Sequence, residues 1–252
     1  MLGYATKTVE MRGVHLRVYV TSTKEEQRLE ERVVYRVHQR SAQGQGHYQI
    51  LASRTRECGD TQSDEDDTYH DNGIARVADF AGLKYPEESS FFKWDKPFVQ
   101  LETTRGCFNT CAFCVSGGEK PVRYQSLEQV AARLENIQAH GIKDIRVLDR
   151  TFNYDTDRAC SMLDLFTRYA GKMRFHLEIH PSLMPERLKE RITTLPGGLL
   201  HLEAGIQSLD SGVLAVSGRK GSLQASLDGL KVLASLDNVK VHADLIAGLP
   251  EY

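Results

Sequence analysis

The stretch Cys107-Phe-Asn-Thr-Cys111-Ala-Phe-Cys114 places three cysteines on one short segment. Three thiolates in the spacing C-x3-C-x2-C can each bind one iron of an iron–sulfur cube, which leaves the last iron without a protein ligand. A metal position that the protein leaves open can bind and activate a small molecule, as catalytic zinc sites do and structural ones do not. The spacing therefore predicts a reactive metal cluster on a loop.

The cysteine usage of the whole chain supports this interpretation. The chain has 252 residues and five cysteines, an odd number, and three of them are crowded on one loop. Such usage favours metal-binding thiols in a reducing compartment over a disulfide framework. Cys58 and Cys160 stand alone, and each is interpreted as a small, partly buried residue. A structural zinc ion is the rival hypothesis, but its nearest further ligands, His140 and Cys160, lie past a predicted helix.

Strands and helices alternate regularly from the segment that leads into the cysteine loop. Strands are predicted over 98–101, 144–148, 174–179, 199–206 and 239–247. Helices are predicted between these strands. The first begins with a capping box of Ser126 and Gln129 and ends at Gly141, and another has Pro185 in its first turn. Two more cover 160–170 and 222–236. This alternation predicts an α/β fold, a partial TIM-like (β/α) barrel of parallel strands.

Polar residues mark the carboxyl ends of these strands, where the active sites of parallel sheets and barrels gather. In chain order these strand ends carry the cysteine loop, Asp149, Glu178, Glu203 with Gln207, and Asp244. Taken one at a time, such residues are as well explained by ion pairs or helix caps. Their joint placement behind the cysteine loop predicts one site at the mouth of the barrel.

The N-terminal third of the chain lacks this regularity. Residues 1–73 are predicted to form a separate segment of α+β or partly disordered structure, and the acidic stretch 60–71 (DTQSDEDDTYHD) is predicted to be a linker. Within it, Val14–Val20 and Val33–His38 either pair as a hairpin or flank a helix. Residues 74–97 then lead into a barrel over 98–252.

The chain ends directly after the fifth predicted strand. No helix follows that strand, so we expect its edge to be exposed. The barrel is accordingly predicted to be truncated at its C-terminal end, or completed by something outside it.

Bulk composition argues against two partner classes. Lys and Arg total 32 against 34 Asp and Glu, a formal charge of -2, so nucleic acid is not expected as an obligatory partner. The residues Met1–Leu16 include Lys7, Glu10 and Arg12, which breaks any secretory apolar core. No apolar run approaches the roughly 20 residues that cross a bilayer, so no membrane partner is predicted. These features together indicate a soluble, cytoplasmic protein.

Several segments resemble the radical S-adenosylmethionine (radical SAM) enzymes. The spacing of the three cysteines, with Phe113 just before the last, is similar to that superfamily's cluster motif, and the resemblance covers 98–252. The strand-end segments Glu178–Pro181, Gly205–Gln207, Ser217–Arg219 and Asp244–Pro250 look like the coproporphyrinogen-dehydrogenase-like branch. The segments Leu148–Asn153, Cys114–Ser116 and Val122–Arg123 are closer to cobalamin-associated radical SAM proteins, in which a corrinoid-binding domain precedes the barrel.

The resemblance implies a radical SAM barrel with a 4Fe-4S cluster on Cys107, Cys111 and Cys114, and S-adenosylmethionine (SAM) on the remaining iron. It implies cofactor contacts from Phe113 beside the cluster, Glu178 or Asp149 at the amino group, Arg219 at the carboxylate, Gln207 and Asp244 at the ribose, and Ile246 and Gly248 at the adenine. One electron would cleave SAM and give a 5′-deoxyadenosyl radical that takes hydrogen from a substrate. Implied partners are a small-molecule or peptide substrate and an electron donor such as a flavodoxin or ferredoxin.

Two departures from the family pattern limit what is carried over. The family often has Gly-Gly-Glu after the second strand; here Gly117-Gly118-Glu119 lies behind the cluster loop and is interpreted as a turn, while Asp149 occupies the second strand end. Residues 1–73 contain no Asp-x-His-x-x-Gly, the cobalamin-ligating signature. Cobalamin is therefore not expected on this chain, although full-length relatives can use it.

Three functional interpretations stay open. The first is a radical SAM enzyme that modifies an unknown substrate. The second is a methylthiotransferase acting on tRNA or protein, which would need further cysteines in an N-terminal domain where only Cys58 is found. The third is a cluster-binding fragment without activity.

Overall fold

The structure is a computed structural model that describes residues 6–11, 14–20, 80, 82–116 and 119–249. Apart from Phe80, these residues belong to one compact unit, Met1–Thr21 with Ala81–Tyr252. The predictions for Val33–His38, Cys58, the linker at 60–71 and Gly117-Gly118 lie outside the described residues.

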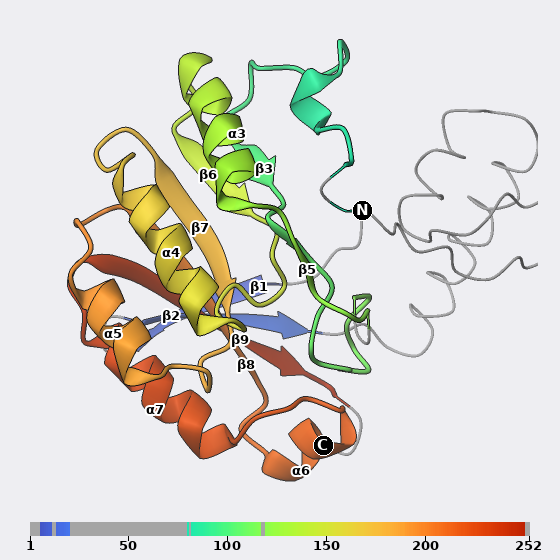
Figure 1. The fold of residues 1–252 in the computed structure, drawn as a ribbon. Coiled ribbons are helices and arrows are strands. Elements are labelled where there is room, and N and C mark those ends of the chain that lie inside the picture. Colours follow the sequence, from blue (N-terminus) through green and yellow to red (C-terminus); the bar gives the residue numbers. More distant parts are fainter. Residues whose placement is uncertain (1–5, 12–13, 21–79, 81, 117–118, 250–252) are drawn as a thin grey trace, which may run out of the picture. The chain divides into compact units, whose positions relative to one another are not determined.

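A seven-stranded sheet forms the centre of this unit (Figure 1). In spatial order its strands are β1 (Thr6–Met11), β2 (Val14–Val20), β9 (Val239–Ala247), β8 (Leu200–Gln207), β7 (Arg174–Ile179), β6 (Asp144–Val147) and β3 (Val99–Leu101). All neighbours pair in parallel except β1, which is antiparallel to β2. The predicted α/β fold with a parallel, partial barrel is confirmed, and the five strands predicted after residue 97 begin and end within one residue of their expected limits.

The prediction of an exposed edge on the fifth strand is wrong. Strand β2 pairs in parallel with β9, from His15 beside His242 to Val20 beside Ala247. The backbone groups that would otherwise form an open edge therefore find partners in a segment far away in sequence. This hairpin lies within the residues 1–73 that we expected to be separate; for the rest of that segment the division stays a prediction.

Helices cover one face of the sheet (Figure 1). They are α3 (Leu127–Ala139), α4 (Thr156–Thr167), α5 (Glu186–Thr193), the short α6 (Ser211–Val216) and α7 (Leu223–Ala234), with a 3-10 turn at Pro86–Glu88. The predicted capping box of Ser126 and Gln129 is present at α3. Pro185 is the N-cap of α5 instead of a first-turn residue, and Asp210 caps α6 through its side chain. No helix among the described residues is long and apolar enough to cross a membrane.

The core lies between the sheet and these helices. Alternate strand residues such as Phe175, Leu177 and Leu202 are buried against Phe166 of α4 and Leu188 of α5. Because side chains alternate along a strand, the intervening residues point to the opposite face, where they are polar and half-buried. The sheet therefore has an apolar outer face and a polar inner face.

Candidate functional site

The three cysteines lie on the loop between β4 (Thr104–Arg105) and β5 (Arg123–Tyr124), a two-stranded ribbon that follows β3. One backbone hydrogen bond, from Cys107 N to Glu119 O (2.8 Å), joins the two sides of this loop, and another, from Ala112 N to Ser217 O (2.8 Å), holds its middle. Lys220 N donates to Asn109 Oδ1 (2.9 Å). The cluster loop is thus held against the segment that joins α6 to α7.

A glycine makes that contact close. Gly218 has a φ of +70°, and a Cβ there would lie 2.8 Å from the carbonyl oxygen of Thr110 in the cluster loop. A positive φ is readily adopted by glycine alone, and the space admits no side chain. The sequence segment Ser217-Gly-Arg219 is therefore shaped by the backbone of the cysteine loop.

The thiols lie close enough together for their charges to interact. Burial raises the pKa of Cys111, a hydrogen bond and the charge of Arg219 oppose this, and the charges of Cys114 and Cys107 raise it further. Cys107, Cys111 and Cys114 are all free of disulfides. The guanidinium of Arg219 thus favours the ionised form of the Cys111 thiol, which is the form that ligates iron.

The three free thiols supply the number of ligands that an iron–sulfur cube with one open iron takes from a protein. Among the residues the structure describes, no three His, Cys, Asp or Glu side chains converge on one metal position. A structural zinc site requires such convergence. An iron–sulfur cube takes one thiolate per iron, so its cysteines surround it without meeting at one point.

Arg219 connects the cysteine loop to the end of β8. Its guanidinium donates to the carbonyl of Gly205, and the Gln207 side chain lies directly over the same glycine. A Cβ at Gly205 would collide with the Gln207 amide nitrogen. Gln207 itself has a φ of 70°, an uncommon conformation for a non-glycine residue that is typical of functional sites.

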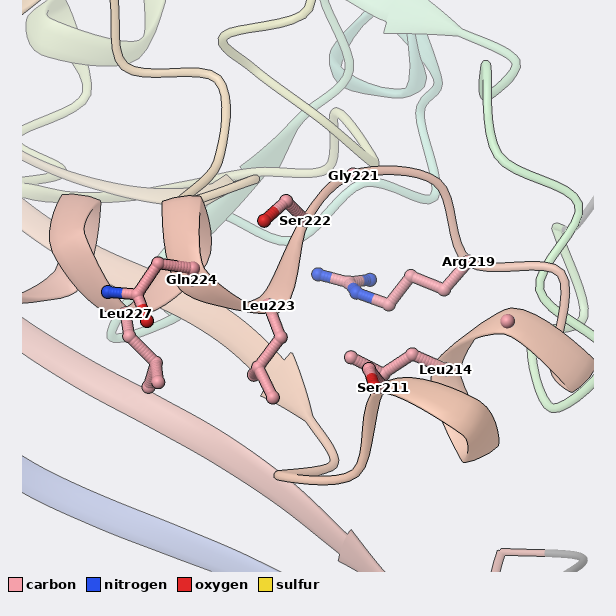
Figure 2. A pocket seen from close by; sticks show the side chains of 9 residues that line it. Ser211, Leu214, Arg219, Gly221, Ser222, Leu223, Gln224 and Leu227 are labelled. Carbon is pink, nitrogen blue, oxygen red and sulfur yellow. The ribbon is translucent and has the colours of Figure 1, made fainter.

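A cavity of about 440 Å³ lies beside Arg219, between α6 and α7. Figure 2 shows the Arg219 side chain extending into the space bounded by Leu214, Ser222 and Leu223. Arg219 is half-buried between this cavity and the thiols, and burial lowers its pKa. The cation is thus available from one side to a ligand at the loop.

Asp149, which we predicted as a SAM contact, already has hydrogen-bond partners within the protein. Its carboxylate accepts hydrogen bonds from the backbone N–H groups of Thr103 and Thr104 (2.8 Å each) and from the Thr103 hydroxyl. The residue is 1% exposed, and burial raises its pKa to about 6. The carboxylate therefore joins the end of β6 to the segment that enters the cluster loop.

The remaining predicted residues lie along the inner face and its rim. Glu178 is half-buried, and burial raises its pKa while Arg150 lowers it. Asp244 is 5% exposed and stands in register beside Gly205, whose carbonyl accepts from the Arg219 guanidinium, so the structure brings Asp244 close to Gln207 and to that guanidinium. Ile246 and Phe113 are half-buried, and Gly248 is exposed with a φ of +81°.

Two buried asparagines were missed by sequence reasoning. Asn109 holds Lys220, as described above, and Asn153 holds the turn after β7: its Oδ1 accepts from His180 N (2.8 Å), and its Nδ2 donates to the carbonyls of His180 (2.9 Å) and Leu183 (2.6 Å). Both are at most 4% exposed. The position of Asn109 between two cluster cysteines could have indicated a turn. Nothing in the local sequence indicated the hydrogen bonds of Asn153.

The fold and the cysteine loop define the class. The sequence model of the radical SAM superfamily matches residues 101–252, and the chain belongs to this superfamily. Its members use a 4Fe-4S cluster and SAM, so the predicted cofactors are confirmed at the level of the family.

Several curated proteins are similar in sequence. The ribosomal protein uS12 methylthiotransferase RimO of Moorella thermoacetica is 30% identical over 62% of this chain and 38% of its own length. A tRNA-2-methylthio-N(6)-dimethylallyladenosine synthase of Prosthecochloris aestuarii is 29% identical over 59% of this chain and 35% of its own length. The chain thus spans little more than a third of these relatives.

A solved structure shares the fold. The radical SAM methyltransferase TsrM of Kitasatospora setae, determined with cobalamin and a [4Fe-4S] cluster bound, superposes with a TM-score of 0.52 and 16% identity. The match covers 60% of this chain and 29% of that one. It supports the partial barrel.

Proposed function

We propose that this chain carries the SAM-cleaving core of a radical SAM enzyme, with Cys107, Cys111 and Cys114 as the cluster ligands. The observation that carries the proposal is the cysteine loop itself, bound to the α6–α7 segment and beside Arg219, inside the matched domain. When bound, the cluster supplies the one electron that cleaves SAM to methionine and a 5′-deoxyadenosyl radical.

The chain's own residues would bind and orient SAM. Glu178 would accept a hydrogen bond from its amino group, and Arg219 would form a bidentate pair with its carboxylate. Gln207 and Asp244 would bind the ribose, Ile246 and Gly248 would edge the adenine, and Phe113 would shield the cluster. For Asp149 we propose a positioning role, since its carboxylate is engaged by Thr103 and Thr104.

Anaerobic reconstitution of the full chain tests this function. Iron and sulfide per chain are measured first, and 5′-deoxyadenosine is measured after dithionite and SAM are added. Asp244→Ala should weaken SAM affinity about tenfold while cluster content is kept, because a ribose contact is lost. An equal loss of SAM affinity and cluster content would contradict the ribose role. Cluster formation with no 5′-deoxyadenosine would instead support a cluster-binding protein without activity.

A methylthiotransferase is the second candidate, favoured by the names of the two relatives described above. One of those names specifies a tRNA product, so the expectation that nucleic acid is not a partner rests on net charge alone and stays a prediction. Two clusters per chain after reconstitution would favour this candidate, and one cluster would favour a different radical SAM reaction. The substrate, a small molecule or peptide, and a flavodoxin or ferredoxin as donor remain proposals.

A further inference from the structure

The inner face of the sheet carries a repeated motif. His176-Leu-Glu178, His201-Leu-Glu203 and His242-Ala-Asp244 place a histidine two residues before an acid on three successive strands, β7, β8 and β9. These residues alternate with buried apolar residues of the opposite face. The interior of a TIM-like barrel is ordinarily filled with branched apolar side chains, so a polar inner face indicates a binding surface.

Strand register sorts this face into rows. The nitrogen row consists of one residue from each of five adjacent strands, aligned partner by partner: Gln100, Arg146, His176, His201 and Lys240. Every member can donate an N–H, and none is a carboxylate. The next row toward the mouth, the acidic row, contains Glu178, Glu203 and His242. Rows two residues apart are separated by about 7 Å along a strand.

The histidines form a connected array. The rings of His176 and His201 stack with centroids 4.4 Å apart, and those of His201 and His242 are also 4.4 Å apart with a hydrogen bond between their nitrogens. His176 Nε2 lies 3.0 Å from Glu203 Oε2. The contacts among these side chains hold the array in place. The side chains of His176 and Glu203 are still 25% and 20% exposed, so a ligand can reach them.

Charge distinguishes the two rows. Within the nitrogen row, Arg146 and Lys240 lie on either side of the two histidines, and both are exposed. The pKa of His201 is lowered to about 4, first by burial and then by the charges of His176, His242 and Lys240, while the charge of Glu203 opposes them. An anion would relieve this crowding of donors and positive charge. The acidic row suits the positively charged sulfonium and amino groups of SAM instead.

We propose that the nitrogen row binds a carboxylate or phosphate group of the substrate. The inference rests on the proposed function, because Glu178 of the acidic row is the residue assigned there to SAM. It deepens that function by naming the substrate class, an acidic small molecule. The spacing of the rows places the anionic group about 7 Å along the strands from the residue that orients SAM.

Titration of the histidines in the reconstituted full chain with SAM tests the inference. Imidazole NMR signals are followed against pH without additive, with inorganic phosphate and with succinate. An anion at the row raises the pKa of His201 by about one unit, which corresponds to tenfold tighter binding to the protonated form. A shift with phosphate alone identifies a phosphate site, and a shift with succinate alone identifies a carboxylate site.

Matched variants locate the effect. Lys240→Gln removes an exposed positive charge and His201→Gln removes the imidazole, so each should weaken binding of the probe that shifts the histidines about tenfold. His140→Gln, at the end of α3 where the ring stacks on Trp94 at 3.7 Å, leaves binding of the probe unchanged. Equal binding by Lys240→Gln and wild type would overturn the assignment of the row.

The outcomes separate this inference from the proposed function. If neither probe shifts any of the three histidines in a preparation that produces 5′-deoxyadenosine, the anion site is wrong and the SAM-cleaving core stands. If the probes bind but no 5′-deoxyadenosine forms, the proposed function fails, and with it the assignment of the row to a radical SAM substrate.

Discussion

Arg219 brings a positive charge to the three cysteines of the cluster loop. It contacts Cys111 and the carbonyl of Gly205, and the charges of all three loop cysteines act on it. Without that guanidinium, burial and the charges of Cys107 and Cys114 would both favour the protonated form of Cys111. A single residue thus serves the cluster ligands and, in the proposed function, the SAM carboxylate.

The first prediction at this scale concerns Cys111. Cys111→Ala removes one of three thiolates, so iron content and the brown chromophore should be lost together with SAM cleavage. Cys160→Ala is the matched control, because Cys160 is also buried but lies on α4. Iron analysis and the 5′-deoxyadenosine assay check both variants. Full cleavage activity in Cys111→Ala would show that the ligand assignment is wrong.

Asp149 allows a prediction about pH. Its native pKa of about 6 exceeds the ordinary value of 3.8, so the folded protein holds this proton more tightly than the unfolded chain. The corresponding stabilisation is complete below 3.8 and is lost as the pH rises through about 6, a total of about 3 kcal/mol. Asp149→Asn does not titrate, so the wild type should lose free energy of unfolding relative to the variant across that interval.

Urea unfolding of both proteins at several pH values measures this difference. His180 and His201, whose pKa values are lowered to about 4, mainly by burial, change the free energy of unfolding with pH in the opposite direction. Both proteins contain these histidines, so their effect cancels in the difference between wild type and Asp149→Asn. A difference that does not vary with pH would contradict the buried-acid account.

At the scale of elements, two loops far apart in sequence depend on each other. Gly218→Ala would introduce a Cβ 2.8 Å from the Thr110 carbonyl and displace the cluster loop. Gly171→Ala is the control, since its φ of +74° imposes similar backbone strain, of order 1 kcal/mol, with nothing within 4 Å. Both variants should lower the unfolding temperature, and only Gly218→Ala should lower the iron content. Equal iron loss would contradict the docking.

Local sequence predicted the elements better than their partners. The five predicted strands after residue 97 and the capping box at Ser126 follow from residue pattern and local hydrogen bonds. The pairing of β2 with β9 joins segments more than 200 residues apart, and no local pattern encodes it. Asp149 shows the same limit at the site: its type was informative, but its partners, Thr103 and Thr104, depend on the fold.

At the scale of the whole molecule, the two faces of one sheet serve different purposes. The outer face packs against the helices and stabilises the fold. The inner face has histidines and acids where a structural core would have apolar side chains, which costs packing energy. Such a cost is consistent with a surface retained for binding.

The last prediction tests whether the N-terminal hairpin completes this sheet. β2 has a neighbour on each side, so Val18→Pro removes a ladder hydrogen bond whichever way its N–H points. The free energy of unfolding should fall by about 1–3 kcal/mol because a ladder partner is left unpaired, and hydrogen exchange across 239–247 should become faster because β9 loses its neighbour. Val18→Thr keeps the backbone N–H and the β-branched shape, so it should match the wild type in exchange. If the proline variant is as stable and as protected as the threonine variant, β2 does not belong to the sheet and the edge of β9 is covered in another way.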